Sequence, residues 1–225
     1  MCGRYTMSKE EGTLHQRFHV QMGLPGAIVP RYNVAPSQQV PIIRMEEDDR
    51  ILESAKWGLV PPWAKDTRIG YIAINARAEG IETKPMFKSA LRRRRCLMPA
   101  DGFYEWKREG KLKLPYRFSL ADGGLFAFAG LWEFWKQPDD TWLHSCAIIT
   151  TGANSLVGAI HDRMPVILPR DAEDDWLTAP PDDIDHLLRM LQPYPAEAMR
   201  ADRVSPAVNS VANESADLVL PLNSA

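Results

Sequence analysis

The sequence predicts an α+β fold: a single domain built mainly on an antiparallel sheet or a partly closed barrel, with flanking helices. Most of the chain reads as short β-rich runs separated by Pro, Gly and Asp, and helical patterns occur near its two ends. Strands and helices do not alternate, and neither GxGxxG nor GxxxxGK[ST] occurs, which argues against a nucleotide-binding α/β fold. Because 225 residues can bury a substantial core, we expect one domain over residues 1–220 and a short tail over 221–225.

The first helix is expected to begin at Ser8, because Glu11 three residues later completes a capping box. Leu14, Phe18 and Met22 then recur at helical spacing. A Gly-Leu-Pro-Gly sequence over residues 23–26 is expected to end the helix.

Seven later segments combine aliphatic, aromatic and β-branched residues between turn residues, as strands do. They are residues 39–45, 53–59, 95–100, 116–120, 125–135, 144–151 and 165–168. An Asp-Gly-Gly sequence over residues 122–124 predicts a hairpin turn between two of them. Helical segments return at about residues 171–177 and 182–190.

Composition excludes several classes of protein. The longest apolar run, residues 125–132, is far shorter than a membrane span, and the first residues lack the apolar stretch of a signal peptide. Cys2, Cys96 and Cys146 are an odd set without a CxxC pair, so we expect no disulfide framework and a cytoplasmic location. The histidines show no metal-ligand spacing with cysteine, and we predict no metal site and no cofactor.

The net charge of −2 conceals an uneven distribution. Residues 1–120 hold 21 Lys and Arg against 13 Asp and Glu, whereas residues 121–225 hold 6 against 16. Such asymmetry is a known sign of a basic binding surface, but two differently solvated faces would produce the same count. The charge pattern alone leaves both interpretations open.

The chain start carries the most distinctive chemistry. Once Met1 is removed, Cys2 has a free α-amine and a thiol on adjacent carbons. An α-amine titrates near ~8 and a lysine amine near ~10.4, so the α-amine is far richer in free base at neutral pH. It can form a Schiff base with an aldehyde, and the thiol can then close a thiazolidine ring. A Met-Cys start also occurs by chance, and by itself it does not distinguish the two cases.

Three polar residues, expected at turns between strands, are candidate partners for such a reaction. Glu105 lies between aromatic residues that could dry it and raise its pKa, although an exposed strand-edge glutamate is an alternative. His161 could transfer protons or simply cap a turn. Asn75 could orient a hydroxyl or carbonyl, or be an ordinary turn residue.

Six motifs in order resemble the SRAP (SOS response-associated peptidase) family, whose members shield abasic sites in single-stranded DNA by covalent crosslinking. They are Met1-Cys2-Gly3-Arg4-Tyr5, Arg31-Tyr32-Asn33-Val34-Ala35-Pro36, Trp57-Gly58-Leu59-Val60-Pro61-Pro62-Trp63, Asn75-Ala76-Arg77-Ala78-Glu79, Asp101-Gly102-Phe103-Tyr104-Glu105-Trp106 and His161-Asp162-Arg163-Met164-Pro165-Val166. The resemblance spans residues 2–169 and continues more weakly to about residue 220. Any one motif alone would be unspecific, but six in register are highly specific.

The resemblance implies a role for each candidate. Cys2 would bond to the ring-opened sugar aldehyde through a thiazolidine, with Glu105 as the proton-transferring group. His161 would assist opening of the sugar ring, and Asn75 would position Cys2 or the sugar. The family also implies lyase-type strand incision and autocatalytic removal of the first residue, which explains the peptidase label.

The same resemblance implies DNA contacts. Arg4, Arg31, Arg77 and Arg163 would bind phosphates, with Asn33 beside them in its motif. Trp63, Trp106, Met86 and Phe87 would stack on or wedge between bases, or else pack in the core. The Arg92-Arg93-Arg94-Arg95 run is left out, because alternate side chains of a strand face opposite sides. Ala212 stands where the resemblance suggests a basic residue.

The expected partner is therefore single-stranded DNA containing abasic sites, bound by a monomer that joins the nucleoid at damaged DNA. Two other functions stay open. One is an N-terminal-nucleophile amidohydrolase, because class II glutamine amidotransferase domains also begin Met-Cys-Gly; that fold needs four-layer αββα packing with long helices. The other is a non-catalytic single-stranded DNA-binding module.

Overall fold

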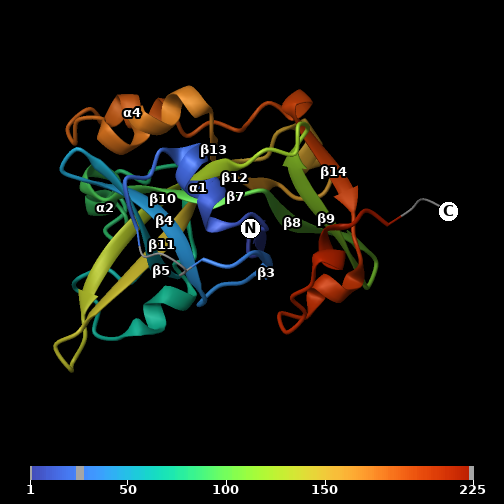
Figure 1. Ribbon diagram of the computed structural model, residues 1–225, viewed down its shortest axis with the longest axis horizontal. Coiled ribbons are helices and arrows are strands. Elements are labelled where there is room, and N and C mark those ends of the chain that lie inside the picture. Colours follow the sequence, from blue (N-terminus) through green and yellow to red (C-terminus); the bar gives the residue numbers. More distant parts are fainter. Residues whose placement is uncertain (1, 24–27, 223–225) are drawn as a thin grey trace.

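A five-stranded barrel forms the centre of the molecule in the computed structural model, which describes residues 2–23 and 28–222 (Figure 1). In hydrogen-bonded order its strands are β11 (Trp142–Gly152), β10 (Phe126–Lys136), β7 (Arg95–Ala100), β4 (Gln39–Glu46) and β5 (Asp49–Trp57), and it closes where β5 pairs in parallel with β11. Short strands attached to it are β2 (Met22–Gly23), β6 (Asn75–Arg77), β12 (Arg163–Pro165) and β13 (Ile167–Leu168). The predicted class, a mainly antiparallel sheet with a barrel and flanking helices, is confirmed.

A second, five-stranded sheet lies beside the barrel, on the right in Figure 1. Its order is β14 (Met199–Arg203), β9 (Leu112–Leu120), β8 (Gly102–Glu109), β1 (Tyr5–Met7) and β3 (Arg31–Val34). Aromatic rings join the two sheets in one core: Phe103 and Tyr5 of the second sheet meet Phe128 of the barrel edge-on at 6.3 and 5.7 Å. The start of the chain is thereby held in the second sheet, where β1 lies between β8 and β3.

Asp101 fixes the corner where the chain leaves β7 of the barrel and enters β8 of the second sheet. Its buried carboxylate accepts hydrogen bonds from the Thr6 hydroxyl (2.5 Å) and the Ser8 backbone N–H (3.0 Å), and the Arg117 guanidinium lies 3.3 Å away. A buried carboxylate is stable only with such partners. The corner therefore sets β1, and the residues before it, against β8.

The first helix, α1 (Glu11–Phe18), differs from its prediction at both ends. Ser8 is not its cap, because the Ser8 hydroxyl donates to Asp101 instead, and the capping position falls to Glu10 without a side-chain bond. The predicted capping box is therefore wrong. Met22 lies in β2 rather than in the helix, and of the predicted stop over residues 23–26, residues 24–26 lie outside the described part of the chain.

All seven predicted strands exist, with their ends shifted by a few residues and the segment 165–168 split between β12 and β13. Sequence patterns did not delimit β1, β3, β6, β8 or β14. The further helices are α2 (Lys88–Arg93), α3 (Ser155–Gly158), α4 (Glu173–Thr178) and α5 (Ile184–Arg189). Short 3₁₀ turns are η1 (Thr67–Tyr71), η2 (Arg170–Ala172), η3 (Ala196–Ala198), η4 (Pro206–Asn209) and η5 (Ala216–Val219).

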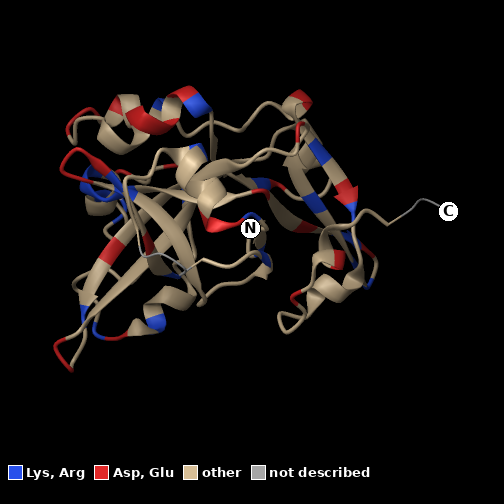
Figure 2. Ribbon diagram, viewed as in Figure 1, with Lys and Arg blue, Asp and Glu red and all other residues tan. Residues whose placement is uncertain are grey.

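The acidic second half of the chain neutralises part of the basic first half. Glu173 of α4 forms an ion pair with Arg17 at 2.7 Å, and Asp174 pairs with Arg50. Figure 2 shows acidic residues gathered along the helices at the top left, away from the second sheet on the right. Part of the basic excess is therefore used inside the fold, while other basic residues remain on the second sheet.

The described chain stays attached to the fold up to its end. Leu218 in η5 is buried, and the Leu222 N–H donates to the Arg203 carbonyl at 2.7 Å. Residues 223–225 of the expected tail lie outside the described residues. The three cysteines are buried and free, and no helix among the described residues is long and apolar enough to cross a membrane.

Candidate active site and nucleic-acid interface

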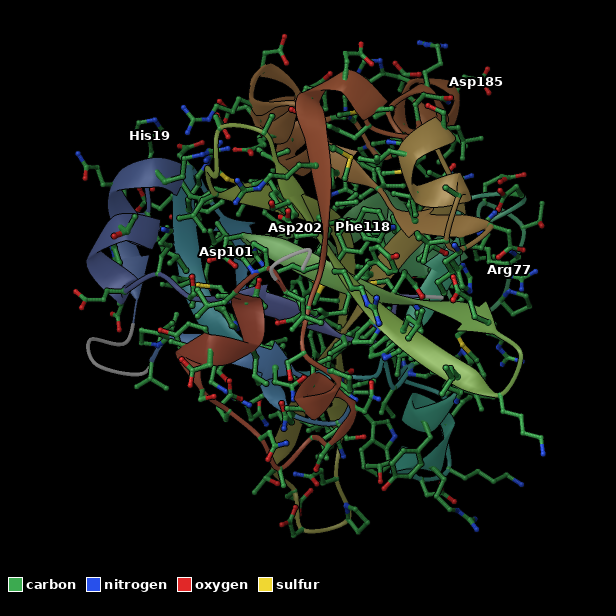
Figure 3. All side chains as sticks on the ribbon, turned by 90° about the vertical axis from the view of Figure 1, so that its right-hand side faces the viewer. His19, Arg77, Asp101, Phe118, Asp185 and Asp202 are labelled. Carbon is green, nitrogen blue, oxygen red and sulfur yellow. The ribbon has the colours of Figure 1, made fainter. Side chains whose placement is uncertain are left out.

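A pocket of about 430 Å³ opens where the second sheet meets the segment between α3 and β12. It is lined by Arg4, Glu105, Trp106, Arg108, Lys113, His161 and Asn209. In Figure 3 the green strands β8 and β9 cross the face turned toward the viewer, from the Asp101 corner to a turn at the right-hand edge. Two of the four predicted catalytic residues, Glu105 and His161, line this pocket directly.

Cys2 lies fully buried behind the pocket, three residues before β1. Its carbonyl accepts a hydrogen bond from the Asn75 amide at 2.8 Å, and its thiol lies 3.8 Å from the Arg4 carbonyl. Burial and the negative charge of Glu105 raise the pKa of the Cys2 thiol, which is therefore protonated at neutral pH. The influence of Glu105 on this pKa means that the two groups are close in space.

Strand pairing explains why Cys2 and Glu105 come together. Tyr5 of β1 pairs with Phe103 of β8, and the Tyr104 N–H donates to the Arg4 carbonyl at 2.9 Å. Continuing this antiparallel register two residues beyond the Tyr5–Phe103 pair brings Glu105 level with Gly3. The prediction that Glu105 lies at a turn is wrong: it lies inside β8, where alternation and pairing fix its direction.

Glu105 is only 3% exposed. Burial raises its pKa to about 7, while the positive charge of the chain's amino group acts in the opposite direction. A carboxyl group with this pKa exchanges protons readily at neutral pH, which is the property of a general acid or base.

Asn75 is the first residue of β6, which lies parallel to β11 with Asn75 opposite Ile148. It therefore starts a strand and is not a turn residue. Its amide nitrogen holds Cys2, but its buried carbonyl oxygen has no hydrogen-bond partner among the described residues. An unpaired buried acceptor next to the reacting residue can receive a hydrogen bond from a ligand.

His161 lies between α3 and β12, and its backbone N–H donates to the Val157 carbonyl at 2.9 Å. Its Nδ1 accepts the Arg163 N–H at 3.0 Å and is also 3.1 Å from the carboxylate of Asp162. The two contacts require different protonation states of Nδ1. Burial, followed by the positive charge of the chain's amino group, lowers the pKa of His161, so the neutral ring with its proton on Nε2 is favoured at neutral pH.

Arg4 and Asn33 form one hydrogen-bonded unit that holds η4 and the segment after it. The Arg4 guanidinium donates to Asn33 Oδ1 at 2.6 Å and to the Val208 carbonyl at 2.8 Å. The Asn33 amide donates to the Ser210 and Asn213 carbonyls at 2.9 and 2.8 Å. Arg4 reaches the pocket, whereas Asn33 is fully buried behind it and can act on a ligand there only through Arg4.

Trp106 forms part of the pocket wall. Its indole N–H donates to the Asn209 side chain at 2.6 Å, and the Arg4 guanidinium lies 5.8 Å from its ring. An aromatic ring held in this way, half-buried at a pocket rim, is suited to stacking with a base.

Arg31 and Arg163 do not line this pocket, and their charges are already paired. Arg31 meets Glu214 at 2.8 Å, and the same carboxylate accepts the backbone N–H groups of Tyr32 and Asn33. Arg163 forms a two-pronged pair with Glu79 at 2.5 and 2.9 Å. A phosphate would have to compete with these carboxylates.

A model of the family described as "SOS response associated peptidase (SRAP)" matches residues 1–211. The chain belongs to the SRAP family. It is 48% identical over 221 residues to "Abasic site processing protein YoqW" of Bacillus subtilis, a match covering 97% of this chain and 99% of that protein. It is 29% identical to "Abasic site processing protein HMCES" of Gallus gallus, with 88% of this chain and 68% of that protein covered.

Solved structures agree with the fold of this SRAP chain. A crystal structure of a protein from Bacteroides thetaiotaomicron superposes with a TM-score of 0.89 at 27% identity, covering 98% of this chain and all of that one. A second, from Bordetella bronchiseptica, gives a TM-score of 0.78 at 29% identity, covering 91% of this chain and all of that one.

The remaining predicted DNA-binding residues of the SRAP chain divide by exposure. Arg77 and Trp63 are exposed, and Figure 3 places Arg77 at the right-hand edge, where the β8–β9 turn also ends. Phe87 is 7% exposed and belongs to the core, and Met86 packs against that core while half-buried. Phe87 fits the core-packing alternative, whereas Trp63 and Arg77 are accessible to a ligand.

Three pocket residues of the SRAP chain were not predicted: Arg108, Lys113 and Asn209. Arg108 and Lys113 belong to the run of basic residues after the Glu105 motif, which is a sequence signal for them. Their position in the pocket follows from the pairing of β8 with β9, and no spacing rule in the sequence gives it. By contrast, Arg95 of the arginine run is buried and donates to the Trp176 and Leu91 carbonyls, so it serves the fold.

Proposed function

We propose that this chain processes abasic sites in single-stranded DNA by forming a covalent bond between Cys2 and the ring-opened sugar. The carrying observation is the arrangement around Cys2, which is buried beside Glu105 and held through its carbonyl by Asn75. Its relatives named as abasic site processing proteins support the same substrate. We further propose that it acts as a monomer in the cytoplasm, reaching the nucleoid when it binds damaged DNA.

The proposed reaction begins when hydrolysis removes Met1 and frees the α-amine of Cys2. The amine attacks the C1′ aldehyde carbon, and the resulting carbinolamine loses water to give a Schiff base. The thiol sulfur adds to the imine carbon while its proton passes to the nitrogen, which closes the thiazolidine. The sum is one C–N bond and one C–S bond formed, with one water released from the aldehyde.

The protein supplies the proton transfers. Glu105, with a pKa of about 7, can give a proton to the departing hydroxyl and then take the thiol proton that the high pKa of Cys2 retains. The neutral His161 can donate its Nε2 proton to the sugar ring oxygen, which promotes ring opening. The Asn75 carbonyl oxygen, which has no partner among the described residues, can accept a hydrogen bond from the attacking amine or from a sugar hydroxyl.

Two associated activities follow from the same groups. A Schiff base acidifies the neighbouring C2′ proton, and its removal by a base expels the 3′ phosphate, which is a lyase reaction. Glu105 beside Cys2 can also assist hydrolysis of the Met1–Cys2 bond in the same molecule. We propose both as side or preparatory activities of this site, with peptidase action limited to the chain's own first residue.

The fold disfavours the amidohydrolase alternative. That function requires four-layer αββα packing with long helices, whereas the longest helix in the described chain, α1, has eight residues and the sheets form a barrel. A non-catalytic DNA-binding module remains the competing hypothesis, and the state of Cys2 decides between them.

The test incubates Met1-processed protein with a single strand whose uracil has been excised, followed by denaturing electrophoresis. Wild type is expected to give a stable adduct, and the buried-cysteine control Cys96→Ala the same. Cys2→Ala keeps an α-amine but no thiol, so it should give an adduct only after borohydride reduction. Absence of an adduct from processed wild type would refute the proposal, and a stable unreduced adduct from Cys2→Ala would refute the thiazolidine.

A further inference from the structure

We propose that Arg108 and Lys113 form a phosphate clamp at the rim of the pocket, which binds the DNA backbone beside the reacting nucleotide. The proposal deepens the proposed function and rests on it for the nature of the strand. Neither residue belongs to the six motifs that identified the family.

Strand register sets the two cations against each other. Arg108 of β8 pairs directly with Lys113 of β9, so their Cβ atoms lie about 5 Å apart. Like charges in directly opposite positions destabilise a sheet. Both residues are exposed and both line the pocket that contains Glu105 and His161. An anion between them would remove the repulsion.

Both charges are also unused by the fold. Arg108 and Lys113 make no ion pair and no side-chain hydrogen bond to any residue that the structure describes. Their neighbour Lys107 differs, because its ammonium pairs with Glu109 at 2.9 Å. The hairpin therefore keeps one cation neutralised and leaves the two that line the pocket available to a ligand.

Position along the strand identifies which phosphate is in reach. Arg108 follows Glu105 by three residues, which is about 10 Å along β8. Trp106 lies between them and also lines the pocket. A strand whose abasic sugar reacts near Glu105 would therefore place a neighbouring nucleotide, and not the reacting sugar's own group, at the clamp.

The clamp and the reacting groups share one electrostatic environment. The pKa of His161 is lowered first by burial, and the positive charge of Arg108 is among the smaller causes. Arg108 and His161 also line the same pocket. A phosphate bound at the clamp would offset that charge.

The test measures binding without chemistry, by fluorescence anisotropy of a labelled single strand carrying a tetrahydrofuran abasic analogue, which has no aldehyde. The double variant Arg108→Gln/Lys113→Gln is compared with wild type and with Lys107→Gln, which removes one charge from the same hairpin outside the pocket. Salt is varied from 50 to 200 mM. The substituted residues Arg108 and Lys113 are exposed, so we expect both variants to fold. An unchanged circular dichroism spectrum verifies this.

We expect the double variant to bind roughly tenfold more weakly, with a salt slope reduced in magnitude by about 0.7 to 1.4, since each phosphate contact in a single strand contributes about 0.7. Lys107→Gln should bind within about twofold of wild type. The loss of adduct in the double variant should shrink as the concentration of reactive DNA is raised, because the clamp contributes binding and no reacting group.

Unchanged affinity and salt slope in the double variant would overturn the clamp. So would a slower adduct rate at saturating DNA with unchanged binding, because the cations would then act on His161 and not on phosphate. If wild type binds the analogue but forms no adduct with reactive DNA, the proposed chemistry fails, and the binding data still judge the clamp by themselves.

Discussion

The cationic side chains on the two sides of the pocket differ in whether other residues of the fold already bind them. On one wall, Arg4 is tied to Asn33 and the Val208 carbonyl, so the guanidinium supports η4, to which Val208 belongs. On the other wall, Arg108 and Lys113 face each other across the β8–β9 hairpin with no partner among the described residues. The comparison teaches that an arginine within a family motif can be largely occupied by the fold, while two cations outside the motifs line the same pocket without a partner among the described residues.

Glu105, on the buried side of the pocket, is expected to give the largest effect. Glu105→Gln should slow adduct formation by about 100-fold, because general acid–base catalysis contributes at least that much. The wild-type rate should change with pH around 7, and the variant should lose that dependence. Single-turnover rates between pH 5.5 and 8.5 measure both. An equal loss of affinity for the unreactive analogue would instead make Glu105 a binding residue.

The same substitution should change stability with a defined sign. A carboxyl whose pKa is raised from 4.5 to about 7 in the folded state destabilises the fold as pH rises through that window, because the unfolded chain ionises first. Glu105→Gln should therefore be more stable than wild type at pH 8 by about 3 kcal/mol, and equal to it near pH 4. Urea unfolding at the two pH values measures this difference.

Arg4 and Arg108 provide the direct comparison of the two walls. Arg4→Met leaves Asn33 Oδ1 without a donor and the Val208 carbonyl with only the 3.4 Å bond from the Asn33 amide, and it should cost about 2 kcal/mol of unfolding free energy. Arg108→Met should change it by less than about 0.5 kcal/mol, as exposed substitutions do. If urea unfolding gives similar losses of unfolding free energy for both variants, Arg4 and Arg108 do not differ in how much the fold depends on them.

Glu79 offers a smaller effect in the favourable direction. Its carboxylate accepts hydrogen bonds from both terminal nitrogens of the Arg163 guanidinium. Glu79→Gln should therefore release that guanidinium for phosphate and tighten DNA binding about threefold at low salt. The Arg108 variant should change binding the other way. Anisotropy titrations measure both, and weaker binding by Glu79→Gln would mean that the ion pair is needed to orient Arg163.

The arginine run should give the smallest effect. Arg92 lies near the acidic Asp182 at 3.8 Å and donates to the Pro181 carbonyl, away from the pocket residues. Arg92→Gln should leave DNA affinity within about twofold of wild type in the same titrations. A loss as large as that of the hairpin variant would show that net charge, and not the position of a cation, controls binding.

Local patterns allowed much of the fold to be predicted. The seven strands were readable because alternating aliphatic and aromatic residues bounded by turns indicate strands without tertiary information. The predicted start of the first helix is wrong because the Ser8 hydroxyl had two possible partners. It binds Asp101, 93 residues away, and not the N-terminus of the helix. A competition of that kind cannot be read from a local window.

The sequence by itself determined the chemistry available at this site: an amine and a thiol on Cys2, and a carboxyl, an imidazole and an amide in motifs far apart along the chain. Tertiary structure decided how they work. Burial in β8 moves the pKa of Glu105 to about 7, and the β8–β9 register brings Arg108 and Lys113 to the same rim. Desolvation and strand pairing are properties of the assembled sheet, so they exist only once distant segments have packed together.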